Sequence, residues 1–299
     1  MQWVRDYQPQ PDQNRMYRQA LWITLGGNVV LAVVKALAAY LSGSVALLAD
    51  AANSVSDVAY SLMMVLGLSM ALRPPDLSHP QGHSRFEPLV GMAVTFSMAF
   101  AGYTAARESI DRFISGGAVV DLGIPALVLF GSAAVKAGMF LYIRRIADRL
   151  GSPTLRTTAM DHISDVLTSL AAFFGVLGSQ VLSPLADPIA GLLVAFWIFR
   201  AAFNAGKENL GYLTGAAAPK ELTDEIIRIT ENVPGVIRVH HLMTEYVGPT
   251  LVVDMHINVN GSLPLRETHA ISDRVTEALQ ELPEVDRAYV HVEPEDWHD

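Results

Sequence analysis

The sequence contains no cysteine among its 299 residues. This absence excludes disulfide bonds, thiolate metal ligands and cysteine nucleophiles, and it leaves the redox compartment undetermined. Charged residues are also scarce, at 17% of the chain, whereas hydrophobic residues make up 51%. Such a chain is too apolar for an ordinary soluble domain and too long for a single core. We therefore expect a membrane domain together with a soluble one.

Basic residues are outnumbered by acidic ones, and the formal net charge is −9. Because the acidic residues are concentrated late in the chain, this balance argues against nucleic acid as a partner. The first fifteen residues are polar and rich in proline and glutamine, so we expect no cleavable signal peptide.

Six apolar runs each reach the roughly 20 residues that a helix needs to cross about 30 Å of hydrocarbon. They cover residues 17–41, 44–71, 87–114, 121–147, 154–182 and 186–207, and they predict six membrane-spanning helices. The positive-inside rule places both termini in the cytoplasm of a protein of the cell (inner) membrane. The basic residues on the side shared by the termini and the even-numbered loops are Arg15, Arg18, Arg73, Arg85, Arg144, Arg145, Arg149, Arg156 and Lys207.

The composition changes after Pro219. Hydrophobic periodicity predicts a helix over 221–231, strands over 237–246 and 250–259, a helix over 265–282 and a strand over 287–292. The expected fold is a membrane α-helical domain followed by a cytoplasmic α+β, ferredoxin-like αββαβ domain. We expect an N-terminal segment at 1–16, the membrane domain at 17–208, a linker at 209–219 and the cytoplasmic domain at 220–299.

Acidic residues lie inside two of the apolar runs. Asp161 and Asp165 are four positions apart, which places them on one face of a helix. Asp50, Asn53 and Asp57 fall at i, i+3 and i+7 and also line one stripe. Carboxylates in hydrocarbon are costly without a partner or an aqueous path. Helix-packing polar residues or a hydrated network are the alternative, but a divalent cation shared between the two helices explains both stripes.

These segments resemble the cation diffusion facilitators, a family of metal/proton antiporters with six transmembrane helices and a cytoplasmic metallochaperone-like domain. The resemblance covers nearly the whole chain. In that family the second and fifth helices each contribute a pair of ligands four residues apart. The resemblance therefore implies a transport site of Asn53, Asp57, Asp161 and Asp165. It also implies a homodimer that contacts metal ions, protons and the lipid bilayer.

The four implied ligands are all hard oxygen donors. Zinc-transporting members of the family usually have histidine at one or two of these positions. Nitrogen and sulfur donors favour Zn²⁺, Cu²⁺ and Ni²⁺, whereas an oxygen cage suits Mn²⁺, Mg²⁺ or Fe²⁺. We expect Mn²⁺ as substrate, as in the manganese branch, with Zn²⁺ or Fe²⁺ as the alternative and passage of Co²⁺ or Cd²⁺ left open. Asp50 and His162 are expected to support the ligands, although ligation by His162 remains an alternative to packing.

The carboxylates of the implied transport site also indicate coupling to protons. Three ionised carboxylates close together in a low dielectric repel one another, so the site should hold at least one proton when it has no metal. Metal then expels protons, and protons displace metal. The expected protein is a secondary active transporter that exports metal by alternating access, and not an enzyme.

The loop after the second run carries Asp76, His79 and His83 around a turn shaped by Pro80 and Gly82. Such a group can close around a cation, and it matches the ligand positions of the family's loop site. We expect it to bind zinc weakly or not at all.

The other interpretation of this loop is a solvated segment that caps the next helix. Ser84 is then the N-cap, and Glu87 is the acidic residue three positions later. The sequence leaves the two interpretations open.

Histidine is concentrated in the C-terminal domain. His240, His256 and His291 fall on the three predicted strands, His269 falls on the helix, and Glu293 follows His291 by two positions. These positions resemble the family's cytoplasmic metal sites, which implies a regulatory divalent metal that stabilises a dimer. A purely structural dimerisation role is the alternative.

Two basic residues leave open questions. Lys136, in the fourth run, either snorkels to the membrane surface or pairs with a carboxylate of the transport site. Many relatives pair the basic residue after the loop histidine, here Arg85, with an acid after the sixth helix. Residues 213–215 contain no acid, so what replaces that pair is undetermined.

Other function classes fit the sequence less well. An intramembrane aspartyl protease also needs two membrane carboxylates, but it explains neither Asn53 nor the loop histidines. A passive cation channel predicts rings of charge around a pore. A metal-sensing receptor does not need polar stripes in two spans.

Overall fold

The computed structural model describes residues 4, 11–42, 45–116, 124–181 and 183–296. Within these ranges the side chains at 42, 45–50, 52–53, 124–126, 129, 172–173, 175–181 and 187 lie outside the description. The chain divides into two compact units, Met1–Asn209 and Leu210–Asp299.

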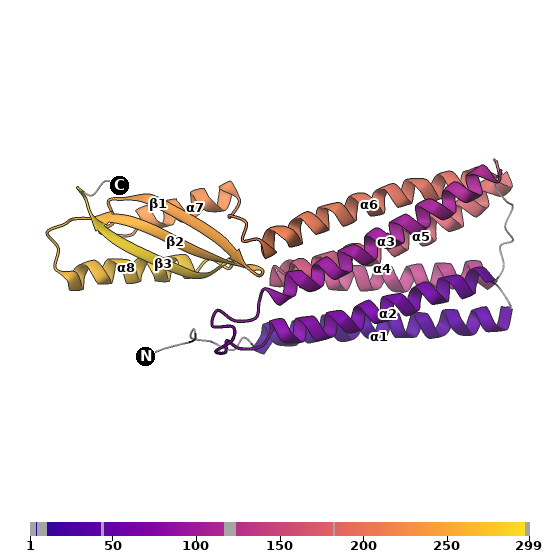
Figure 1. The fold of residues 1–299 in the computed structure, drawn as a ribbon, viewed down its shortest axis with the longest axis horizontal. Helices are drawn as coiled ribbons and strands as arrows, with labels where there is room; N and C mark the ends of the chain where they lie inside the picture. The colour runs from indigo at the N-terminus through magenta and orange to yellow at the C-terminus, as the bar shows by residue number, and fades with distance from the viewer. Residues whose placement is uncertain (1–3, 5–10, 43–44, 117–123, 182, 297–299) are drawn as a thin grey trace. The chain divides into compact units, whose positions relative to one another are not determined.

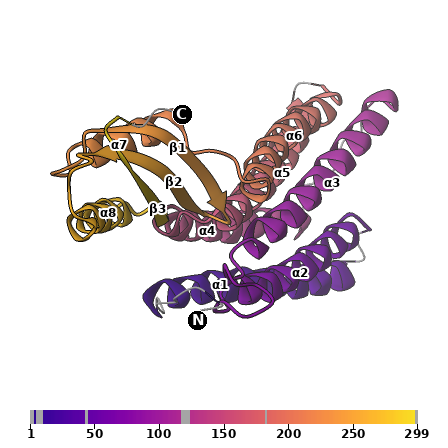
Figure 2. The same ribbon diagram turned by 60° about the vertical axis from the view of Figure 1, so that its left-hand side comes forward.

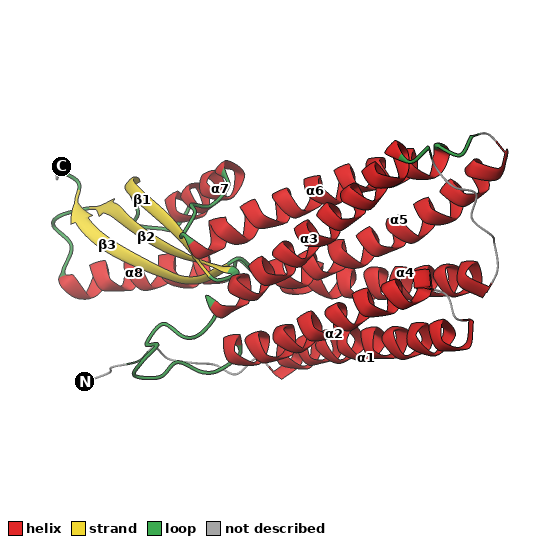
Figure 3. Cartoon of the chain, turned by 45° about the vertical axis from the view of Figure 1, so that its right-hand side comes forward, coloured by secondary structure: helices red, strands yellow, loops and turns green. Residues whose placement is uncertain are grey.

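Six long helices occupy the first part of the chain (Figure 1). They are α1 (Pro11–Ser42), α2 (Val45–Ala71), α3 (Phe86–Ile114), α4 (Ile124–Leu150), α5 (Pro153–Val181) and α6 (Ala186–Leu213). α1 packs against α2 and α4, whereas α5 packs against α3 and α4 (Figures 2 and 3). Two elements far apart in the sequence, α2 and α5, can therefore contribute to one polar site in this unit.

Each of these helices has 27 to 32 residues, which at 1.5 Å per residue is long enough to cross a bilayer. Length and apolar composition of the described residues identify four candidate spans, Pro11–Leu41, Ser54–Ala71, Phe86–Ile114 and Pro188–Leu213. α4 and α5 are not among them, and these are the helices that carry Lys136, Asp161 and Asp165. Six spans therefore remain a proposal, with four of them supported by hydropathy.

The interior of the helical unit is formed where α1, α2, α4 and α5 meet. Leu21, Met64, Ile143 and Leu155 come from these four helices, and each is at most 3% exposed. Many other apolar side chains of the helices point outward, as expected for helices that face lipid. The buried apolar core that holds these helices together is therefore narrow.

The C-terminal unit confirms the predicted αββαβ order. It contains α7 (Lys220–Glu231), β1 (Arg238–Val247), β2 (Thr250–Val259), α8 (Leu265–Gln280) and β3 (Val285–Pro294). The sheet order is β1-β2-β3, with β1 antiparallel and β3 parallel to the central strand. β3 is longer than the predicted 287–292, so it includes Glu293.

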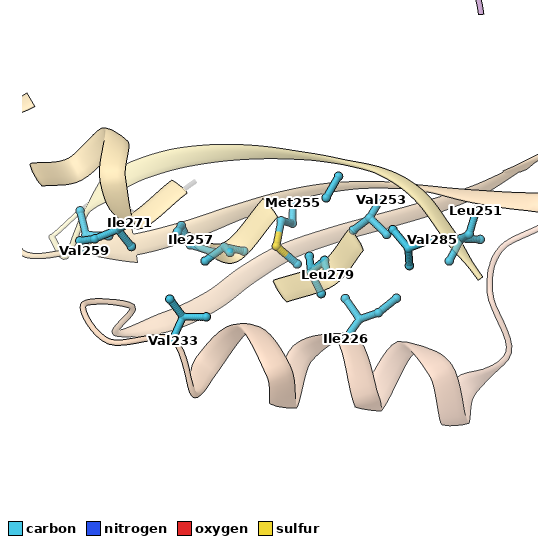
Figure 4. Packing of buried hydrophobic residues seen from close by; sticks show 12 residues of the cluster. Ile226, Val233, Leu251, Val253, Met255, Ile257, Val259, Ile271, Leu279 and Val285 are labelled. Atoms are coloured by element: carbon cyan, nitrogen blue, oxygen red, sulfur yellow. The ribbon is translucent and has the colours of Figure 1, made fainter. Parts of the chain in front are cut away.

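One face of this sheet forms the core of the domain (Figure 4). Alternate residues of β2, such as Met255 and Ile257, are fully buried against Ile226 of α7 and Leu279 of α8. Because side chains alternate across a strand, His256 points to the opposite face. The two helices therefore leave one face of the sheet available for polar side chains.

Glu87 is a buried carboxylate in the first turn of α3, with 4% exposure. Tyr17 donates a hydrogen bond to its Oε2 at 3.1 Å, and Ser152 donates one to its Oε1. Thr154 donates to the Glu87 carbonyl oxygen at 2.5 Å. The prediction of Ser84 as the N-cap was wrong, because the N-cap of α3 is Arg85 and it has no side-chain cap hydrogen bond. The Glu87 side chain instead points inward and ties α1 and the start of α5 to α3.

We expect Glu87→Ala to lower the unfolding free energy by about 1–3 kcal/mol, because it leaves buried hydroxyl groups without their acceptor. Thermal unfolding of the purified protein in detergent measures this loss. Glu108→Ala is the matched control on the same helix, since the Glu108 side chain is 65% exposed and forms an ion pair with Arg112. Equal effects of the two substitutions would contradict the structural role of Glu87.

Candidate metal sites

Acidic side chains from α2 and α5 meet inside the helical unit. Asp57 lies on α2, and Asp161 and Asp165 lie on consecutive turns of α5. Ligand atoms of Asp161, Asp165 and His162 all lie within 4.8 Å of one another. The side chains of Asp57 and Asp165 are only 14% and 26% exposed. The structure thus brings together three of the four residues expected to form the transport site.

Lys136 of α4 lies between two of these carboxylates. Its Nζ donates a hydrogen bond to Asp57 Oδ2 at 3.0 Å and forms an ion pair with Asp165 Oδ2 at 2.6 Å. The lysine side chain is 4% exposed. Of the two possibilities left by the sequence, the structure supports pairing with the site carboxylates.

The side chains of Asp50 and Asn53 lie outside the described part of the chain. The backbone of α2 is helical through both positions, so Asn53 precedes Asp57 by about one turn. Asn53 therefore remains a proposed ligand, and Asp50 remains a proposed supporting residue.

His162 is completely buried beside the carboxylates of α5. Among the described residues, neither of its ring nitrogens has a hydrogen-bond partner. A nitrogen donor therefore lies next to the oxygen donors, at a position where the sequence predicted a supporting role.

A short hydrogen-bond chain fixes the turn of α2 that carries Asp57. Asn28 of α1 donates to Ser61 Oγ at 2.8 Å, and the Ser61 hydroxyl donates to the Asp57 carbonyl oxygen at 2.7 Å. Sequence reasoning missed these two residues. The available signal was the position of Ser61, one helical turn after Asp57.

The loop between α2 and α3 brings Asp76, His79 and His83 together. Asp76 Oδ1 accepts hydrogen bonds from the backbone amides of Ser78 and His79, at 2.9 and 2.7 Å. The His79 Nδ1 lies 3.6 Å from Asp76 Oδ1, and the His83 Nε2 lies 3.5 Å from Asp76 Oδ2. The three residues expected as ligands in the loop site are therefore within reach of one ion.

The backbone amides of His79 and then Ser78 lower the pKa of Asp76 below its ordinary value of 3.8, and the two histidines add to this effect. The carboxylate therefore remains in the ionised form that binds cations. Because the pKa is lowered in the folded chain, these interactions are complete above the ordinary pKa and are lost as the pH falls below it.

A third cluster lies on the open face of the C-terminal sheet. Glu293 is 9% exposed and is central to it. Its carboxylate oxygens lie 2.8 Å from His240 Nε2, 3.5 Å from His256 Nδ1 and 3.4 Å from His291 Nε2. His256 and His291 are paired in the register of β2 and β3. Four of the five residues expected in the cytoplasmic site are therefore gathered here.

A register irregularity in β1 explains the position of His240. The pairing with β2 shifts between Val239 and His241, so two consecutive residues oppose one. The ring of His241 consequently lies 4.8 Å from that of His256. His241 was missing from the sequence prediction. The signal in the sequence was the pair of adjacent histidines, His240 and His241, in a strand whose side chains otherwise alternate between the two faces of the sheet.

His269 is not part of this cluster. It lies on α8, whose apolar face packs on the opposite side of the sheet. Its side chain is 74% exposed and lies 3.8 Å from Asp273 one turn later. The fifth expected residue of the cytoplasmic site is therefore separated from the other four by the sheet.

Comparison with known proteins agrees with the division into a helical domain and a C-terminal domain. The cation efflux transmembrane domain matches residues 21–214, and the cation efflux protein cytoplasmic domain matches residues 218–295. The uncharacterized transporter MJ0449 of Methanocaldococcus jannaschii is 35% identical over 93% of this chain and 99% of its own length. The manganese efflux system protein MneS of Bacillus subtilis is 27% identical over 91% and 93%, and the cation-efflux pump FieF of Shigella boydii is 28% identical over 89% and 88%.

The chain therefore belongs to the cation efflux, or cation diffusion facilitator, family. It is a membrane-spanning transporter that exports divalent metal cations, and not an enzyme. A helical transmembrane domain is followed by a cytoplasmic domain with a mixed sheet.

We expect Glu293→Gln to weaken Mn²⁺ or Zn²⁺ binding by the cytoplasmic domain by about tenfold or more, because it removes the negative charge at the centre of the histidine cluster. Calorimetric titration of residues 210–299 measures this change. His269→Ala is the matched control and should leave the affinity unchanged. A larger loss from His269→Ala would contradict the placement of the site on the open face.

Proposed function

We propose that this protein exports Mn²⁺ from the cytoplasm in exchange for protons, by alternating access of one transport site to the two sides of the cell membrane. The observation that carries the proposal is the convergence of Asp57, Asp161 and Asp165 inside the helical unit. Asn53, one turn before Asp57, is the fourth ligand in this account.

Manganese follows from the kind of donor atom. Carboxylate and amide oxygens suit Mn²⁺, whereas nitrogen and sulfur donors favour Zn²⁺, Cu²⁺ and Ni²⁺. The similarity to MneS, a manganese efflux system protein, supports this choice. Protons compete with the metal for the same carboxylate oxygens, so the inward proton gradient supplies a driving force for export.

Zn²⁺ or Fe²⁺ transport is the second candidate, and His162 is the observation that favours it. Its ring lies beside Asp161 and Asp165, and neither nitrogen has a described hydrogen-bond partner. Rotation of this ring toward the ion would add a nitrogen donor and shift the preference along the Irving–Williams order.

The remaining clusters have supporting roles in this proposal. The cytoplasmic domain forms a homodimer, and a divalent metal held by His240, His256, His291 and Glu293 stabilises it. Both termini face the cytoplasm. The loop site of Asp76, His79 and His83 binds Zn²⁺ weakly, if it binds a metal at all.

Transport into proteoliposomes that contain a pH-sensitive dye tests the function. We expect saturable Mn²⁺ flux with opposing proton movement, reduced at least about 100-fold in Asp57→Asn/Asp165→Asn because ion binding by carboxylates is lost. Asp148→Asn is the control, since Asp148 is half exposed and pairs with Arg144. Metal flux without proton movement would indicate a channel, and zinc flux above manganese flux would overturn the selectivity.

Asn53→His tests the fourth ligand separately. We expect it to raise the ratio of Zn²⁺ to Mn²⁺ transport by about tenfold, because an imidazole nitrogen replaces an amide oxygen. The same proteoliposomes with each metal in turn give this ratio. An unchanged ratio would remove Asn53 from the ligand set.

A further inference from the structure

Lys136 supplies a positive charge at the point where the transported metal must bind. Its Nζ lies 3.0 Å from Asp57 Oδ2 and 2.6 Å from Asp165 Oδ2. The two acceptors come from α2 and α5, and the lysine comes from α4. One ammonium group thus bridges the same two carboxylates that bring the metal-binding helices together.

A metal ion and this ammonium group cannot occupy these positions at the same time. Hard divalent ions lie about 2.0–2.6 Å from their oxygen ligands, so an ion held by Asp57 and Asp165 needs nearly the same space as Nζ. Two cations a few ångströms apart in a low dielectric also repel each other strongly. Metal binding therefore requires the lysine head group to leave.

The lysine side chain is suited to this movement. An ammonium is a compact charge on a flexible four-carbon stem, whereas a guanidinium is a rigid fork that binds carboxylates in a bidentate manner. The head group can therefore withdraw while Lys136 stays anchored in α4.

We propose that Lys136 is a tethered competitor of the transported ion: its ammonium group pairs with Asp57 and Asp165 when no metal is bound, and a metal must bind these carboxylates tightly enough to displace it. The inference rests on the proposed transport site. The competition favours divalent over monovalent ions. A monovalent ion that replaces the ammonium group brings no additional positive charge to the carboxylates, whereas a divalent ion brings one more.

The surrounding charges agree with a competing role. Lys136 also interacts electrostatically with Asp161 and His162 of α5. Lys35 of α1 is 7% exposed and acts electrostatically on Asp57. Three carboxylates thus face two lysines. When the Lys136 ammonium group withdraws, three negative charges and one positive charge remain, and a divalent ion balances the difference.

The alternative is a purely structural ion pair that holds α2, α4 and α5 together. The two roles predict opposite signs for the effect of removing the charge. Loss of a structural pair loosens the site and weakens metal binding, whereas loss of a competitor strengthens metal binding.

The test is equilibrium binding of Mn²⁺ to the purified full-length protein, with the transport site defined as the binding that Asp57→Asn/Asp165→Asn abolishes. We expect Lys136→Met to lower the Kd of this site by about tenfold or more, since it removes the competing cation and keeps the length of the side chain. Lys136→Arg should raise the Kd by about tenfold, because the guanidinium holds both carboxylates more firmly. Arg144→Met, two turns later on α4 and half exposed, is the matched control and should leave the Kd unchanged.

A Kd for Lys136→Met equal to or above that of the wild type would overturn the proposal. If that variant does not fold, Lys136→Arg decides, because a Kd equal to or below that of the wild type also contradicts competition. Absence of Mn²⁺ binding that depends on Asp57 and Asp165 in the wild type would instead reject the proposed transport site itself.

Discussion

Negative charge buried among apolar helices is the constraint on which the helical unit depends. Asp57, Asp161 and Asp165 are too costly to leave in hydrocarbon without positive partners, and Lys136 supplies one at 2.6 and 3.0 Å. An ion pair that is only structural could be replaced by apolar side chains at little cost. The arrangement of three carboxylates around the Lys136 ammonium group is therefore better explained by the proposed exchange of cations than by stability.

The other two clusters use a different mixture of donors. The loop and the cytoplasmic sheet combine one carboxylate with two or more histidines, whereas the helices supply mainly oxygen. Histidine and carboxylate together bind late transition metals well, so these sites are suited to retaining an ion. In the proposed mechanism the carboxylate site exchanges its ion more readily, because protons and Lys136 compete for the same oxygens. On this proposal, the transport site and the regulatory sites differ in the donor atoms that they offer to a metal.

The sequence was sufficient for the elements and for part of the site. The length of the apolar runs predicted the six long helices, and hydrophobic periodicity predicted the αββαβ order. The spacing of four residues predicted that Asp161 and Asp165 share a face. Contacts between distant segments were not predictable in this way. Asp57, one of the two carboxylate partners of Lys136, lies 79 positions from it, and Ser152, which donates a hydrogen bond to Glu87, lies 65 positions from that residue. Periodicity assigns a face to a residue but does not identify its neighbour, and it also gave no indication of the irregular register that brings His241 to the cytoplasmic cluster.

The central claim is that a divalent ion is held between α2 and α5 by oxygen donors alone. Pulsed electron paramagnetic resonance of bound Mn²⁺ tests it most directly, because a coordinated imidazole gives a nitrogen coupling that oxygen ligands do not. The sample is the full-length protein with His79→Ala, His83→Ala, His256→Ala and Glu293→Gln, so that the transport site is left intact. We expect bound Mn²⁺ without nitrogen coupling. A nitrogen coupling that disappears in an added His162→Ala substitution would show that His162 is a ligand and would contradict the manganese selectivity argued from an oxygen cage.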